Sequence, residues 1–173
     1  MRSMQPMDAH ELAALGCPWC GRVRQGGVLG FKVVRDKVVL GAIVLAPDRG
    51  ELGVCPSGTA VVRSLWVRPE EVGEHVGTQL VERAAAHLRA GHARCLVSAG
   101  TRGTADCARP PASWLEHVGF VEHVAGVQWR LDLRRTLPLV RQVSDALDAA
   151  VRAFRPARPA PAGRNAAMPA SRS

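Results

Sequence analysis

The order of apolar and polar positions predicts a strand, a turn and a helix in direct succession. An apolar run over Val61–Val67 stops at an Arg-Pro pair and has the length of a buried strand. From residue 76 to residue 90 the apolar positions recur every three or four residues, which is the spacing of one helix face. Gly73 and Gly77 mark the turn between them. Such a turn leaves unpaired backbone N–H groups at the helix N-terminus, where they can hold a phosphate.

Similar patterns predict the remaining elements. A helix within residues 1–16 is expected to begin at Asp8 as its N-cap, and a helix within 111–120 to end at Gly119 as its C-cap. The other expected elements are a hairpin of strands 26–36 and 37–47, strands over 94–98 and 127–133, and an amphipathic helix within 134–154. Glycine-bearing loops are expected at 48–58 and 100–109. This order of elements is that of an α/β protein.

The length and the composition divide the chain into four parts. The 173 residues suffice for one domain with an adequate core. The expected parts are an N-terminal segment 1–25, a central domain 26–133, a C-terminal amphipathic helix 134–155 and a tail 156–173 rich in Pro, Ala and Arg. The tail has too little apolar content to offset the entropy of ordering, so we expect it to be disordered.

The net charge of +8 is carried mostly by the C-terminal part. Residues 1–133 hold 15 Lys and Arg against 13 Asp and Glu, which gives +2, whereas residues 134–173 hold 8 against 2, which gives +6. A nucleic-acid footprint needs basic residues on a folded face together with stacking aromatic side chains. The tail after Phe154 has no aromatic residue. We therefore expect no specific nucleic-acid partner.

Three features of the sequence predict a cytoplasmic protein. The chain has no uninterrupted apolar window of about 18 residues, so no membrane span is expected. No apolar segment of the kind found in secretory signals follows Arg2. The five cysteines, an odd number, suit a reducing compartment better than a disulfide framework.

Two motifs in the same order and at a suitable distance resemble those of the GNAT N-acetyltransferase superfamily. The family segment V-x-P-E-x-R-G-x-G-x-G-x-x-L has its counterpart in VRPEEVGEHVGTQL at 67–80, and F-Y-x-x-x-G-F in SWLEHVGF at 113–120, which is one residue longer than the family pattern. The resemblance covers roughly residues 26–133. The chain is also similar to a subgroup from GC-rich bacteria with N-terminal cysteines, a C-x-x-P-A-x-F/W-L segment before the last helix and an extra C-terminal helix. Cys17 and Cys20, residues 107–115 and residues 136–151 stand in those places, with one residue more between Cys107 and the Pro-Ala pair than the subgroup pattern has.

The resemblance implies a mixed, mostly antiparallel central sheet flanked by helices. It also implies that acetyl-CoA is the acyl donor and that the acetyl group passes directly to an amine, with the acceptor and a homodimer left open. A rival interpretation is a catalytically degenerate module that binds acyl-CoA or a protein partner. Its basis is three departures from the family motifs. Val72 replaces the usual Arg or Gln, His75 replaces the middle glycine, and Trp114 replaces the tyrosine that often serves as general acid.

The cofactor residues follow from the resemblance, residue by residue. The strand is expected to pair its backbone with the pantetheine arm near a bulge that frees an N–H for the thioester oxygen. The turn is expected to hold the pyrophosphate. The strand residues are Leu65, Trp66 and Val67, and the turn residues are Val72, Gly73, Glu74, His75, Val76, Gly77 and Thr78.

Candidate catalytic residues rest on position alone. Direct transfer to an amine needs a base, often acting through water, and Glu51 is preferred over Glu70 and Glu71. Cys107 and Ser113 are the candidates for general acid, together with His117, and water could also serve.

The Cys17-Pro18-Trp19-Cys20 segment suggests three interpretations. A redox pair would need a strand before it, and the preceding residues have a helical pattern instead. A zinc site would need two more ligands, and His10, Cys55 and Cys107 are available without metal-binding spacing. We expect a structural pair of cysteines and no metal.

Overall fold

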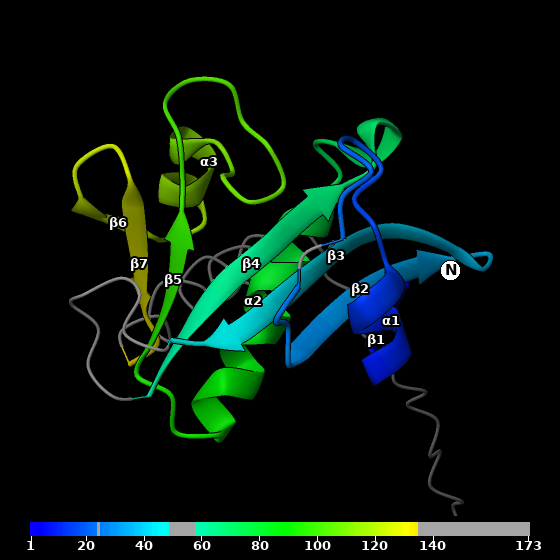
Figure 1. The fold of residues 1–173 in the computed structure, drawn as a ribbon, viewed down its shortest axis with the longest axis horizontal. Coiled ribbons are helices and arrows are strands. Elements are labelled where there is room, and N and C mark those ends of the chain that lie inside the picture. Colours follow the sequence, from blue (N-terminus) through cyan, green and yellow to red (C-terminus); the bar gives the residue numbers. More distant parts are fainter. Residues whose placement is uncertain (24, 49–57, 135–173) are drawn as a thin grey trace, which may run out of the picture. The chain divides into compact units, whose positions relative to one another are not determined.

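The computed structural model describes residues 1–23, 25–48 and 58–134 (Figure 1). The described elements are β1 (Ser3–Pro6), α1 (Ala9–Ala14), β2 (Leu29–Arg35), β3 (Val38–Pro47), β4 (Thr59–Val67), a 3₁₀ turn (Pro69–Glu71), α2 (Val76–Ala90), β5 (Cys95–Ala99), α3 (Ala112–His117), β6 (Val121–Val124) and β7 (Gln128–Asp132). The predicted C-terminal helix and tail, Glu51 and Cys55 lie outside the described residues. No helix among the described residues is long and apolar enough to cross a membrane.

The strands form one seven-stranded sheet in the order β1-β2-β3-β4-β5-β7-β6. Within the described residues β4 and β5 form the one parallel pair, and all other neighbours are antiparallel. A parallel pair needs a crossover connection, and α2 supplies it. The fold class is therefore the predicted one, a mixed and mostly antiparallel sheet with helices.

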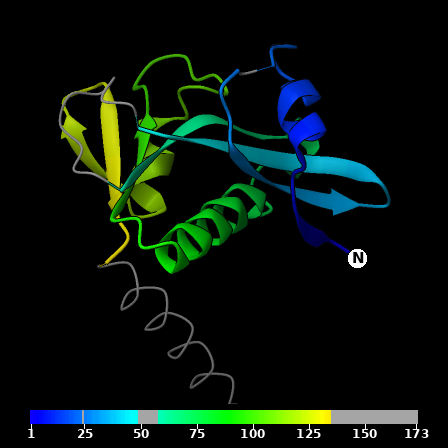
Figure 2. The same cartoon turned by 60° about the horizontal axis from the view of Figure 1, so that its bottom comes forward.

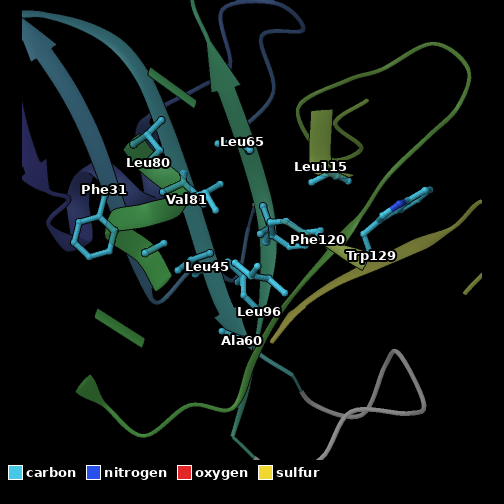
Figure 3. Packing of buried hydrophobic residues seen from close by; sticks show 14 of the residues in the cluster. Phe31, Leu45, Ala60, Leu65, Leu80, Val81, Leu96, Leu115, Phe120 and Trp129 are labelled. Carbon is cyan, nitrogen blue, oxygen red and sulfur yellow. The ribbon is translucent and has the colours of Figure 1, made fainter. Parts of the chain in front are cut away.

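The sheet is covered on both faces, and the two faces differ in composition. Alternate residues of β3 point to opposite sides, so Ile43 and Leu45 belong to one apolar cluster and Ala42 and Val44 to the other. The larger cluster lies under α2 and α3 and contains the big aliphatic and aromatic side chains (Figure 3). The smaller one lies under α1, which Figure 2 shows on the side of the sheet opposite to α2.

A β-bulge in β4 changes the direction of the side chains midway along the strand. Val44 pairs with Ser64 and Leu45 with Val62, so Arg63 is the extra residue. Because of that extra residue, Val62 and Leu65 face the same cluster although they are three positions apart. The bulge that the family resemblance implied is present, two residues before Leu65.

Several local predictions are confirmed in detail. Helix α2 spans the predicted residues 76–90. The hairpin turns through Asp36 and Lys37, both in the left-handed region with φ of 51° and 67°. Asp8 caps α1 and forms a capping box with Glu11. Gly119 follows α3 with φ +98°, and the N–H of the next residue reaches back into the last helical turn.

The sequence did not predict β1, β6 or the 3₁₀ turn. β1 pairs with β2 from Ser3↔Val34 to Pro6↔Phe31, so the N-terminal segment is built into the same sheet as the central domain. Proline is tolerated in β1 because it is an edge strand.

Candidate functional site

The candidate site begins where β4 separates from β5. The two strands pair only over Thr59–Val62 and Cys95–Ser98, although β4 continues to Val67. In the remaining half of β4, which we call the open half (residues 63–67), β3 is the one neighbouring strand among the described residues. A strand edge of this kind exposes backbone donors and acceptors that an extended ligand can pair with.

Two groups of the chain itself occupy this edge. The N–H of Leu65 donates to the carbonyl oxygen of Cys107 at 2.7 Å. The indole Nε1–H of Trp19 donates to the carbonyl oxygen of Val67 at 2.6 Å. Both hydrogen bonds come from irregular segments of the chain. A neighbouring strand would instead make a regular series of backbone hydrogen bonds along this edge. The side chains of the strand residues expected to bind the cofactor point in different directions. Leu65 faces the α2 side of the sheet, and Trp66 belongs to the cluster on the opposite side.

The N-terminus of α2 follows the open half of β4. Gln79 donates its N–H to the carbonyl of His75 at 3.0 Å and so begins the helical pattern. The preceding N–H groups, those of Val76, Gly77 and Thr78, have no acceptor in the described part of the chain. Together with the helix dipole they form a place where an anion is favoured.

His75 adopts the conformation that a glycine would favour. Its φ of 58° and ψ of 12° lie in the left-handed region, and it is the residue that precedes the first turn of α2. Histidine visits this region more often than most side chains, yet the conformation still carries strain. A glycine adopts this conformation without strain, which explains why the family motif has its middle glycine at this position. Val72, Gly73, Glu74 and His75 are all exposed.

The turn before α2 is held by two arginines, Arg2 just before β1 and Arg35 at the end of β2. Glu71 is buried, with 6% of its surface exposed. Its carboxylate binds Arg2 at 2.6 Å through one oxygen and Arg35 through the other. Arg2 also donates to the carbonyl of Glu74 at 3.1 Å. Glu71 thus fixes the turn and is not available as a base.

Trp114 and Gly77 bring α3 and the start of α2 together. A Cβ placed on Gly77 would lie 2.9 Å from Cζ2 of Trp114, which is tighter than side chains tolerate. Gly77 is therefore required by the contact with Trp114 as well as by any close approach of a phosphate. Ser113, next to Trp114 on α3, is exposed, and so is His117 at the end of the helix.

Cys107 is placed differently from the other candidate acids, Ser113 and His117. Its thiol is buried and lies 3.6 Å from the sulfur of Cys20, and Cys17 completes a group whose three sulfur atoms lie within 4.8 Å of one another. The spacing along the sequence gave no indication of this group, because Cys107 lies 87 residues after Cys20. Burial, with a contribution from Cys107, raises the pKa of the Cys17 thiol to about 11, although backbone N–H groups of Trp19 and Cys20 act to lower it.

Asp106 holds the loop that carries Cys107. Its carboxylate accepts the N–H groups of Ala108 at 2.8 Å and Arg109 at 2.9 Å. Although partial burial acts to raise the pKa of this carboxyl, these bonds and the Arg109 guanidinium lower it overall. The loop is thereby fixed next to the open half of β4.

The split between β4 and β5 and the start of α2 point to one class of protein, the acetyltransferase (GNAT) family. The model of the acetyltransferase (GNAT) family matches residues 2–109, so the chain belongs to this family. The match ends before the second motif at 113–120. No protein of curated function matches the sequence.

Solved structures share the fold at low sequence identity. The ribosomal-protein-S18-alanine N-acetyltransferase from Escherichia coli is 12% identical, with a TM-score of 0.58, over 77% of this chain and 94% of that one. A GNAT family N-acetyltransferase from Escherichia coli in complex with CoA is 13% identical, with a TM-score of 0.56, over 76% and 81%. A GNAT family acetyltransferase from Brucella melitensis in complex with acetyl-CoA is 19% identical, with a TM-score of 0.53, over 76% and 88%.

Proposed function

We propose that this protein transfers the acetyl group of acetyl-CoA to an amine. The observation that carries the proposal is the open half of β4 running into an α2 N-terminus with three N–H groups that have no acceptor among the described residues. Membership of the GNAT family and the neighbours solved with CoA or acetyl-CoA support the same donor. The odd number of cysteines favours a reducing, cytoplasmic setting.

In this proposal the donor binds as an added strand. The pantetheine arm lies along Leu65–Val67 and pairs with the backbone, and the pyrophosphate lies against the N–H groups of residues 76–78. To do so the arm replaces the carbonyl of Cys107 and the indole of Trp19 as hydrogen-bond partners of β4. Val72–His75 form the exposed turn beside the diphosphate.

The chemistry is a direct displacement. The neutral amine nitrogen attacks the thioester carbonyl carbon, the C–S bond breaks, and the coenzyme leaves as a thiolate that takes up a proton. The N–H of Leu65 is the proposed donor to the carbonyl oxygen as negative charge develops there. Glu51, which lies outside the described residues, is the proposed base acting through water, and Ser113 or water supplies the final proton.

A non-catalytic module that binds acyl-CoA or a protein partner is the second candidate. Two observations favour it, namely the occupied edge of β4 and the contact of Trp114 with Gly77. Counted back from Gly119-Phe120, the tyrosine of the family motif falls on Leu115, one residue after Trp114, and neither a leucine side chain nor an indole N–H serves as a general acid.

Two measurements on the full chain separate these candidates. Calorimetric titration tests donor binding, and release of free thiol from acetyl-CoA across a panel of small amines and peptide N-termini tests turnover. An acetyltransferase shows both saturable binding and amine-dependent thiol release. Binding without thiol release favours the non-catalytic module, and the absence of saturable heat at about millimolar acetyl-CoA rejects the donor site itself.

A further inference from the structure

Three cysteines from distant parts of the chain meet on the face of the sheet opposite to α2. Cys17 and Cys20 lie in the segment after α1, and Cys107 lies in the loop between β5 and α3. The sulfur atoms of Cys20 and Cys107 are 3.6 Å apart, and all three lie within 4.8 Å of one another. A tetrahedral zinc ion with Zn–S bonds of about 2.3 Å holds its sulfur ligands about 3.8 Å apart. The sulfur positions therefore need only small shifts to surround such an ion.

The backbone around the first two cysteines has the form of a tight turn around one sulfur. The N–H of Cys17 donates to the carbonyl oxygen of Arg22 at 3.0 Å, and the N–H of Gly21 donates to the carbonyl oxygen of Cys17 at 2.8 Å. These two hydrogen bonds close the turn. Gly21 has φ +67°, a conformation that permits this closure. The N–H of Trp19 points at the Cys17 sulfur at 3.4 Å. Backbone donors to a sulfur stabilise its anionic form, as they do around metal-bound thiolates.

The burial of the group has a consequence for its charge. Cys17 and Cys107 are buried and Cys20 is exposed. Without a cation, burial and the neighbouring sulfur hold the Cys17 thiol protonated, with its pKa raised to about 11. A bound divalent cation reverses this preference, because a coordinating thiol is deprotonated outright. An ion can enter from the side of Cys20.

We propose that Cys17, Cys20 and Cys107 bind a soft divalent cation, zinc being the first choice. The two cysteines separated by two residues have the spacing common to structural zinc sites, and thiolates select zinc over magnesium or calcium. Binding converts three S–H groups into three metal–sulfur bonds and releases three protons. The fourth tetrahedral position is left to a ligand other than these three side chains. The inference does not rest on the proposed acetyl transfer.

The site would tie the N-terminal segment to the middle of the sheet. Trp19 lies between the first two ligands, and its indole N–H donates to the carbonyl oxygen of Val67. The third ligand, Cys107, accepts the N–H of Leu65 with its backbone carbonyl oxygen. A single ion would therefore hold both groups that occupy the open half of β4. The sequence alone predicted no metal here, because it gave no reason to add Cys107 to the pair.

The first test is the zinc content of the full chain, purified under reducing conditions without chelator and without added metal. Inductively coupled plasma mass spectrometry should find about one zinc per chain. Cys20→Ala should lose it while keeping its circular dichroism spectrum, because Cys20 is exposed. Cys95→Ala is the matched control and should keep the zinc, since that thiol lies 3.0 Å from the Thr59 hydroxyl, on a strand outside the group.

The second test counts the thiolates. Cobalt(II) added without oxygen to the reduced, metal-free chain should give sulfur-to-cobalt charge-transfer bands that saturate at about one equivalent and disappear on adding zinc. Each of Cys17→Ala, Cys20→Ala and Cys107→Ala should weaken or abolish these bands, and Cys95→Ala should not. Acid should release the metal as protons compete for the sulfurs.

Two results would overturn the proposal. The first is a zinc content of the wild-type chain that is no higher than that of Cys20→Ala, even after both have been reconstituted with zinc. The other is a Cys20–Cys107 disulfide found by peptide mapping of acid-quenched cells, which would make the pair a redox couple instead. Either outcome remains distinct from any result on acetyl-CoA.

Discussion

The two halves of β4 are stabilised in different ways, and the difference separates what holds the fold from what a ligand can use. Over Thr59–Val62 the strand lies between β3 and β5 and its backbone is bonded on both sides by regular ladders. Over the open half, β3 remains on one side, while single groups from the segment after α1 and from the loop before α3 take the other.

The bulge at Arg63 marks the boundary between the halves. A ladder is cooperative, so a ligand cannot replace it without opening the sheet. Two isolated hydrogen bonds, each contributing roughly 0.5–1.5 kcal/mol net, are within reach of a ligand that offers the same donors and acceptors. Damage to the first half should therefore lower stability, and changes around the second half should alter acetyl-CoA binding.

The largest effect is expected from a substitution beside the paired half. Leu96 lies fully buried on β5, opposite Ala60. Leu96→Ala should lower the free energy of unfolding by about 2–5 kcal/mol, through lost burial and the cavity left behind. Denaturant titration measures this, with Val121→Ala on β6 as the control, because that side chain is 70% exposed and should change stability by less than about 0.5 kcal/mol. Equal losses in the two variants would contradict the assignment of the core.

The next effect concerns the N-terminus of α2. Thr78→Glu adds a negative charge to the first turn of α2. This charge stabilises the helix by about 0.3–1 kcal/mol through its interaction with the helix dipole, but it repels a diphosphate. We expect unchanged or slightly higher thermal stability and about tenfold weaker acetyl-CoA binding by calorimetry. This variant is preferable to a change at Gly77, where any side chain also meets Trp114. Val121→Glu adds the same charge on β6, and if it weakens binding as much, the diphosphate is not at this helix start.

A smaller effect of opposite sign is expected at Trp19. Trp19→Phe keeps the ring but removes the indole N–H that occupies the Val67 carbonyl. The free energy of unfolding should fall by no more than about 1 kcal/mol. The affinity for acetyl-CoA should rise a few-fold, about 0.5–1 kcal/mol, because the pantetheine arm no longer displaces that donor. A loss of affinity would show instead that the indole is part of the binding surface.

The sequence predicted those parts of the fold whose local and tertiary preferences agree. Helix α2 has fifteen residues with one continuous apolar face, and its observed bounds are the predicted ones. The β2–β3 turn was predictable in its place. By contrast, Ser3–Pro6 and Val121–Val124 carry mostly exposed side chains, so neither shows the alternation that reveals a half-buried strand. Their pairing partners, which the sequence does not display, make them strands.

The site was predictable only where its features are local. The glycine-bearing turn and the helix start could be read from consecutive residues, and the left-handed backbone at His75 agrees with the glycine expected there. The pairing of Glu71 with Arg2 and Arg35 joins residues far apart in the sequence, and so does the cysteine group. Glu71 appeared in the sequence as one of three candidate bases, and no pattern in the sequence distinguished it as a structural carboxylate.

The smallest effect is a pH dependence at Asp106, the residue that fixes the loop presenting Cys107 to the open half. The pKa of this carboxyl is lowered in the folded protein from an ordinary value of 3.8, because N–H groups and Arg109 outweigh the partial burial. A lowered folded-state pKa contributes stability that is fully present above the unfolded value and is lost as the pH falls through the folded one. Asp106→Asn should therefore be less stable than the wild type at neutral pH, and the gap should narrow as the pH falls below about 4 and vanish only below the folded-state pKa. The carboxyl is partly exposed, so solvent screening keeps the effect small.

Thermal unfolding of both proteins from pH 7 downwards measures this difference in stability. A difference that stays constant across that range would assign the effect to packing instead of charge. Because the paired half of β4 does not depend on this loop, acid should loosen the open half first.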